Sequence, residues 1–137
     1  VNKFVAGFMG MPPMNFLEGQ IEERDGAVFV TGEGFNVQLD GEKAASAKAH
    51  SAREVTLGIR PSDLNFTETP DPARSLTLNV LVSEYVGAQS VLLGQGGAGS
   101  LTVEWNSATP RAMGETLTFA ANPDRIHLFD LQSEAAI

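Results

Sequence analysis

The chain has 137 residues, of which 42% are hydrophobic and 19% charged, as expected for a globular domain rather than a disordered segment. Nine basic residues against 17 acidic ones give a formal net charge of −8, and their scatter argues against a basic stripe for nucleic acid or anionic lipid. Without Cys there is no disulfide or thiolate site, and no apolar run approaches the roughly 18 to 20 residues of a membrane span. We therefore expect a chain that neither crosses a membrane nor carries an export signal.

The first segment predicts a short helix at the N-terminus. Asn2 is a candidate N-cap, and Pro12 and Pro13 end the helical pattern. The apolar residues of the segment share one helical face: Phe4, Val5, Phe8 and Met9. We interpret residues 1–15 as the end of a linker helix that begins upstream.

From Phe16 onward the hydrophobic period changes to two, which is typical of β-strands. Asp25-Gly26 lies between two such runs and predicts a hairpin. Further strands are predicted at residues 35–39, 55–59, 76–82, 90–93, 101–105, 117–119 and 126–129. Many short strands with closely spaced turns predict an all-β barrel or sandwich.

Two segments between the predicted strands lack this alternation. Residues 42–52 are rich in Ala, but their poor apolar face favours an exposed loop over a helix. Residues 67–74 contain Pro70 and Pro72 and are the best candidate for a connector. The predicted domain at 16–137 then has candidate halves at 16–66 and 75–130.

A faint internal repeat supports this division. Residues 55–64 align with residues 117–126 at one constant offset, which places Pro61 over Pro123. In each copy a predicted strand meets a turn that begins with Pro, after which an apolar residue returns to the core. The repeat is either a coincidence or the mark of two similar β-units packed together.

Patterns for catalysis are incomplete or absent. Residues 94–99 match G-x-G-x-x-G, but strand periodicity follows where a dinucleotide site needs a helix, so we predict a hairpin loop. No Walker A pattern occurs, so nothing in the chain cradles nucleotide phosphates. His50 in a loop and His127 in a strand lack the spacing of a metal or catalytic pair, and His127 is predicted to be half-buried. We expect no enzyme activity, cofactor or metal in this chain.

Four blocks of the sequence resemble the ATP-binding subunits of carbohydrate and glycerol-3-phosphate ABC importers, the maltose importer family. They occur in the family's order and span nearly the whole chain: residues 4–17, 57–64, 84–87 and 127–130. The second block contains G-I-R-P and the last reads H-L-F-D. Ser62 replaces the usual Glu of the second block, and the third reads E-Y-V-G where the family more often has E-x-L-G.

The resemblance implies an all-β fold of two OB-like units, of the TOBE or MOP type, that forms the C-terminal regulatory domain of the ATP-binding subunit. In that family two such domains pack together and keep the ATPase domains close. Residues of the blocks are candidates for the site or interface: Phe8, Pro13, Met14, Asn15, Arg60, Pro61, Gly87, His127 and Phe129. The apolar residues Phe4, Phe8, Met9, Met14 and Phe16 suit either core packing or a docking surface for the ATPase domain.

The resemblance also implies partners and a location. The partners are the chain's own ATPase domain, a second copy in a homodimer, the importer's membrane subunits and, in some relatives, a cytoplasmic signalling protein. ATP and Mg²⁺ would be bound by the missing ATPase domain, at the cytoplasmic face of the bacterial membrane.

Two alternatives stay open at this point. Molybdate-binding modules share the implied fold and carry S-A-R-N, to which Ser51-Ala52-Arg53-Glu54 is similar; the Glu places a carboxylate where an anion would bind. A small oxyanion sensor is therefore the second hypothesis. An OB-type nucleic-acid binder is the third, and the aromatic content of 7% and the charge of −8 disfavour it, so we expect no nucleic-acid partner.

Overall fold

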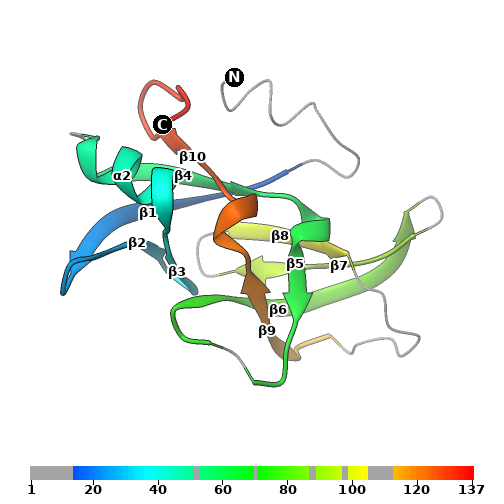
Figure 1. Ribbon diagram of the computed structural model, residues 1–137. Helices are drawn as coiled ribbons and strands as arrows, with labels where there is room; N and C mark the ends of the chain where they lie inside the picture. The colour runs from blue at the N-terminus through cyan, green and yellow to red at the C-terminus, as the bar shows by residue number, and fades with distance from the viewer. Residues whose placement is uncertain (1–13, 51–52, 70, 87–88, 97–98, 105–112) are drawn as a thin grey trace.

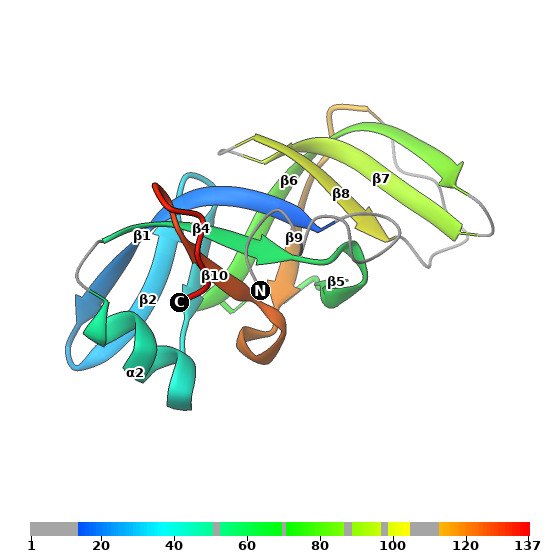
Figure 2. The same cartoon turned by 90° about the horizontal axis from the view of Figure 1, so that it is seen from above.

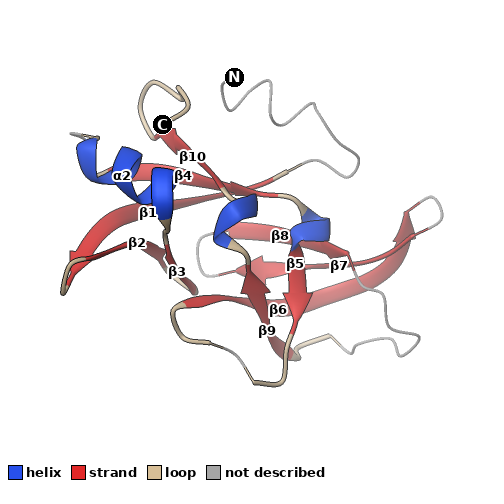
Figure 3. Ribbon diagram, viewed as in Figure 1, coloured by secondary structure: helices blue, strands red, loops and turns tan. Residues whose placement is uncertain are grey.

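The computed structural model describes residues 14–50, 53–69, 71–86, 89–96, 99–104 and 113–137. Within these ranges the strands are β1 Asn15–Arg24, β2 Ala27–Gly32, β3 Phe35–Gln38, β4 Glu54–Ile59, β5 Leu64–Phe66, β6 Arg74–Val86, β7 Gln89–Gly96, β8 Gly99–Glu104, β9 Thr116–Ala121 and β10 His127–Asp130. The helical elements are α2, Gly41–Ala49, and the short 3₁₀ turns η1, Pro61–Asp63, and η2, Pro123–Arg125 (Figure 3). The prediction of an all-β fold is confirmed.

Among the described residues all strand pairs are antiparallel, and the curled sheet that they form divides into two lobes of five strands each. We call the strands β10-β4-β1-β2-β3, with α2, the first lobe, and the strands β5-β9-β6-β7-β8 the second lobe. Pairing of β3 with β6 joins the lobes, which lie on opposite sides in the view from above (Figure 2). Five strands in a curled, partly open barrel match the expected OB-like units.

The hairpin between β1 and β2 follows from its turn residues. Asp25 has φ of 50° and Gly26 has φ of 81°, which is the left-handed pair that a two-residue turn requires. Arg24 therefore pairs directly with Ala27. This register points Ile21 and Val28 into the core of the first lobe.

The internal repeat is the feature that interlocks the lobes. Each copy runs strand, Pro-led 3₁₀ turn, strand: β4-η1-β5 in the first copy and β9-η2-β10 in the second. The strands then pair across the copies, β4 with β10 and β5 with β9. The registers correspond as well, since Leu57 pairs with Leu128 and its equivalent Phe119 pairs with Phe66. The interpretation as two similar β-units packed together is confirmed, and each copy contributes one strand to each lobe (Figure 1).

A side chain also bridges the lobes. Asn15, at the start of β1, is 7% exposed. Its Nδ2 donates to the backbone oxygen of Thr102 in β8, and its Oδ1 accepts from the Thr102 N–H, both at 2.8 Å. The amide therefore pairs with β8 as one more strand residue would, which satisfies both buried polar groups.

The expected loop at residues 42–52 is wrong, because residues 41–49 form the helix α2. Asp40 takes the extended N-cap conformation, and Ala44 and Ala47 pack on the core of the first lobe. The buried face of the helix consists of small Ala side chains, so the sequence shows no clear division between an apolar and a polar face. The high helix propensity of Ala nevertheless stabilises the helix. Within the described residues no helix is long and apolar enough to span a membrane.

The glycine-rich run is a hairpin, as predicted, but its strands extend further. Gly94 and Gly96 belong to β7 and Gly99 to β8, which continues to Glu104. A Cβ on Gly94 would clash with the backbone oxygen of Asn79, beside the irregular register between Val80 and Val82 of β6. Strands β6 and β7 therefore approach each other so closely at this position that a side chain would not fit.

Candidate functional site

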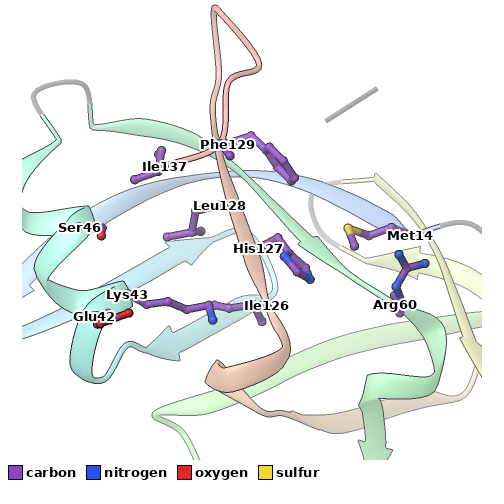
Figure 4. A pocket seen from close by; sticks show the side chains of 11 residues that line it. Met14, Glu42, Lys43, Ser46, Arg60, Ile126, His127, Leu128, Phe129 and Ile137 are labelled. Atoms are coloured by element: carbon purple, nitrogen blue, oxygen red, sulfur yellow. The ribbon is translucent and has the colours of Figure 1, made fainter. Parts of the chain in front are cut away.

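A pocket of about 470 Å³ opens on the first lobe between α2, the end of β4, β10 and the C-terminal turn (Figure 4). Its lining residues come from four segments of the chain: Met14; Glu42, Lys43 and Ser46; Arg60; and Ile126, His127, Leu128, Phe129, Ala136 and Ile137. The pairing of β10 with β4 brings the second and fourth sequence blocks together here.

The apolar side of the pocket rests on two layers. Ile126 and Leu128 belong to the main core, whereas Met14 and Phe129 form a small second cluster with Phe16. The rings of Phe16 and Phe129 meet edge to face, with centroids 6.0 Å apart. Successive residues of β10 point to opposite faces of the strand, so Leu128 packs in the main core and Phe129 in the small second cluster.

Gly58 of the second block makes room for the small cluster. It pairs with Phe16 of β1 on one side and with His127 of β10 on the other. A Cβ at this position would lie 2.6 Å from the Met14 sulfur and 3.2 Å from a ring carbon of Phe129. The glycine therefore allows Met14 to cross the middle of the three strands.

Three basic groups stand in the pocket. Figure 4 shows His127 between Lys43 of α2 and Arg60, the residue that follows β4. His127 is more exposed than the predicted half-buried position, because the pocket opens beside this position of β10, although its ring stays partly buried. Partial burial of its ring lowers the pKa of His127, the charges of Lys43 and Arg60 lower it further, and Asp63 opposes them.

The C-terminal turn that closes one side of the pocket is held by Asp130. Its carboxylate accepts hydrogen bonds from the N–H groups of Ser133, at 2.8 Å, and Gln132, at 2.9 Å, and is bonded to His50 Nε2 at 2.9 Å. The bonds from Ser133 and His50 lower the pKa of Asp130 to about 2. Ile137 then returns to donate to the Leu128 oxygen at 3.0 Å.

The candidate residues from the sequence blocks fall into three groups. Met14, Arg60, His127 and Phe129 line the pocket. Asn15 and Pro61 are buried, in the bridge to β8 and in η1, and do not line it. Phe8, Pro13 and Gly87 lie outside the described residues.

The docking surface proposed for the apolar N-terminal residues is not found at Met14, which is 5% exposed and packs on Phe129. Phe16 is half-buried in the same cluster, and Phe4, Phe8 and Met9 lie outside the described residues.

Sequence reasoning missed Lys43, Ser46 and the bond between His50 and Asp130. Once residues 41–49 are read as a helix, Lys43 and Ser46 fall on neighbouring positions of one face, which would have been the signal. Across the described ranges no three His, Asp or Glu side chains gather as metal ligands would.

Two protein-family models match the sequence of this chain. The sequence profile of the TOBE domain matches residues 57–129, and that of the MalK OB fold domain matches residues 10–64. The chain belongs to the TOBE domain family. The TOBE match begins within β4 and ends in β10, so it contains most of both copies of the repeat and all of the second lobe.

Relatives of this TOBE domain are ATP-binding proteins of ABC transporters. It is 38% identical, over 93% of the chain, to a sn-glycerol-3-phosphate import ATP-binding protein, UgpC of Paraburkholderia xenovorans (strain LB400), covering 34% of that protein. It is 34% identical, over 99% of the chain, to the uncharacterized ABC transporter ATP-binding protein YcjV of Escherichia coli O6:K15:H31 (strain 536 / UPEC), covering 37% of it. The chain therefore spans about a third of the length of these curated relatives. The match is to the TOBE part of such proteins, not to their catalytic domain.

A solved structure shares the fold of the TOBE domain. The cytoplasmic molybdate-binding protein ModG, with molybdate bound, superposes with a TM-score of 0.59 at 15% sequence identity. The match covers 83% of this chain and 94% of ModG. This likeness shows a common fold and confirms the expected OB-like architecture.

Proposed function

We propose that this chain is the non-catalytic regulatory and dimerisation domain of the ATP-binding protein of a sugar or sugar-phosphate ABC importer. The observation that carries the proposal is the convergence of three distant sequence blocks on one pocket, where Met14, Arg60 and His127 meet. Arg60 and His127 belong to neither core cluster, so their meeting at the pocket favours contact with another molecule. The relative from Paraburkholderia is named for sn-glycerol-3-phosphate import, which supports the substrate class.

The physical role of such a domain is to raise effective concentration. Two TOBE domains that stay in contact keep their ATPase domains close after ATP hydrolysis weakens the interface between them. In this proposal the partners are the chain's ATPase domain, a second copy and the membrane subunits, with a cytoplasmic signalling protein as a further partner. ATP and Mg²⁺ belong to the ATPase domain at the cytoplasmic face of the membrane.

Sedimentation equilibrium over a wide concentration range tests the dimer. We expect a reversible monomer–dimer equilibrium, together with no ATP hydrolysis by the isolated chain. A strict monomer at the highest concentrations would contradict dimerisation through this domain, and measurable hydrolysis would contradict the non-catalytic role.

The likeness to ModG keeps an oxyanion sensor as a second candidate. Of the S-A-R-E segment, Ser51 and Ala52 lie outside the described residues, while Arg53 is exposed and bonded to Glu23 at 3.1 Å. A carboxylate beside the guanidinium opposes an incoming anion. Calorimetric titration with molybdate, tungstate and sulfate tests this candidate, and flat titrations would reject it.

A further inference from the structure

The basic residues of the pocket differ from three of the four described arginines outside it, whereas the fourth, Arg125 in η2, likewise forms no salt bridge. Arg24, Arg53 and Arg74 each form a salt bridge, with Glu22, Glu23 and Asp40 respectively. Within the described residues, neither Lys43, Arg60 nor His127 forms a salt bridge or side-chain hydrogen bond, although acidic residues outnumber basic ones by 17 to 9. Three basic groups therefore face the same space without a salt bridge to a described carboxylate.

These groups approach the space from three directions. Lys43 extends from the first turn of α2, His127 from β10, and Arg60 from the end of β4 (Figure 4). Arg60 and Lys43 are half-buried, so water screens their charges less than at an open surface. Arg60 also occupies the N-cap position of η1, where its backbone oxygen accepts from the Asp63 N–H at 2.9 Å, and its guanidinium has no hydrogen-bond or salt-bridge partner among the described residues.

The pocket also has an apolar wall of suitable size. Met14, Ile126, Leu128 and Phe129 are buried residues that border the cavity. About 470 Å³ lies within the usual range of roughly 300 to 1,000 Å³ for small-molecule sites. A ligand that suits this lining has a charged end and a short apolar body.

Two acidic residues in or beside the pocket oppose the binding of an anion. Glu42 lies on the exposed rim, and Asp63 in η1 acts electrostatically on His127. Both repel an anion and therefore weaken the attraction that Lys43 and Arg60 exert on it. Ser46 on α2 adds a hydroxyl donor on the same side as Lys43.

We propose that this pocket binds a small organic phosphate monoester, with its phosphate between Lys43, His127 and Arg60 and its apolar body against Met14, Ile126 and Leu128. A phosphate carries three terminal oxygens and close to two negative charges, which matches three donors arriving from three sides. A carboxylate has two oxygens in a plane and a single charge, so it satisfies fewer of them. The site goes beyond the proposed dimerisation role and does not depend on it.

Phenyl phosphate is a suitable probe, since it joins a phosphate to a compact apolar ring. The chain contains two histidines, His50 and His127, so proton NMR can follow each imidazole separately. We expect bound phenyl phosphate to shift the His127 signals and to raise the pKa of His127, because a nearby anion stabilises the imidazolium. His50, which is bonded to Asp130, serves as an internal control that stays unchanged. Absence of any shift at His127 at millimolar phenyl phosphate would overturn the proposal.

Substitutions locate the phosphate. Arg60→Gln and Lys43→Gln should each weaken phenyl phosphate binding by about tenfold or more, because each removes a charged hydrogen-bond donor. Arg53→Gln removes the same charge at an exposed site outside the pocket and is the matched control. Equal losses in all three variants would show general attraction to positive charge and would overturn the assignment.

Two further ligands test each half of the probe. Inorganic phosphate should bind at least about tenfold more weakly, since it leaves the apolar wall uncovered. Benzoate should also bind more weakly than phenyl phosphate. Equal binding of inorganic phosphate would reject the apolar half, and equal binding of benzoate would reject the preference for phosphate. Sedimentation of the same variants reports dimerisation separately, so the two proposals can fail independently.

Discussion

The two copies of the repeat follow the same path but differ at equivalent positions. Gly58 and Arg60 of the first copy correspond to Ala120 and Asn122 of the second. Asn122 accepts a hydrogen bond from the Asp124 N–H at 2.9 Å and caps its own turn, whereas Arg60 makes no cap bond and lines the pocket. The strand and turn geometry thus needs only the Pro and the apolar residues, which leaves the position before the Pro available for binding.

The largest expected effects come from the equivalent core residues Leu57 and Phe119, which are 1% and 0% exposed. Phe119→Ala should lower the free energy of unfolding by about 3 to 5 kcal/mol and Leu57→Ala by about 2 to 5 kcal/mol. Because each copy contributes a strand to both lobes, urea should unfold the two lobes in one transition. Circular dichroism during urea unfolding measures both quantities.

Leu81 provides the control for these core variants, since it is 51% exposed in β6. Leu81→Ala should change the stability by less than about 0.5 kcal/mol. Two separate unfolding transitions in the wild type would contradict the interlocking of the lobes.

Gly58 and Ala120 test the difference in packing. Gly58→Ala should cost about 1 to 3 kcal/mol, because the added methyl group crowds Met14 and Phe129. The reverse change in the other copy, Ala120→Gly, should cost only about 0.5 to 1 kcal/mol. Adding Met14→Ala to Gly58→Ala should give a smaller loss than the sum of the two single losses, which a double-mutant cycle would detect. If the two stability losses simply add, the methyl group added at position 58 does not crowd Met14.

The capping difference should give a smaller effect. Asn122→Ala removes the bond to Asp124 and should lower the stability by about 1 kcal/mol. Arg60→Gln, at the equivalent position, should leave stability within about 0.5 kcal/mol, because the Arg60 side chain forms no cap bond to η1 and its backbone bond from Asp63 is kept. Thermal and urea unfolding of both variants provide the measurement, and equal losses would remove the distinction between the two turns.

The smallest effect concerns acid stability. Asp130 and its equivalent Glu68 differ, since Asp130 holds the C-terminal turn and Glu68 forms no hydrogen bond within the described residues. The pKa of Asp130 is lowered from 3.8 to about 2 in the folded chain, so its stabilising contribution is present above about pH 4 and is lost as the pH falls towards 2.

Urea midpoints between pH 2 and 6 check this prediction. Asp130→Asn should flatten part of the wild-type loss of stability below pH 4, whereas Glu68→Gln should leave that part unchanged. An identical acid profile for Asp130→Asn and the wild type would show that these hydrogen bonds do not contribute.

The strands, the Asp25-Gly26 hairpin and the repeat were predictable, because their signals are local and periodic. Helix α2 was not, since Ala44 and Ala47 gain their burial only from the strands they cover. Met14, Arg60, His127 and Phe129 could be named from the sequence blocks, but nothing in the sequence showed that β10 would carry His127 back beside Arg60 and Lys43. That arrangement depends on pairing between strands about half the chain apart, which local patterns do not record.

The order of synthesis gives the pairing of β10 with β4 a further consequence. On the ribosome, β1 to β4 emerge long before residues 127–130, so the first lobe waits with β4 as an unpaired edge. Synthesis proceeds at about 5 to 20 residues per second, which leaves this edge open for several seconds. A nascent or truncated chain that stops before β10 would therefore expose a strand that invites pairing with other chains, and folding of the first lobe would be completed only once β10 has emerged.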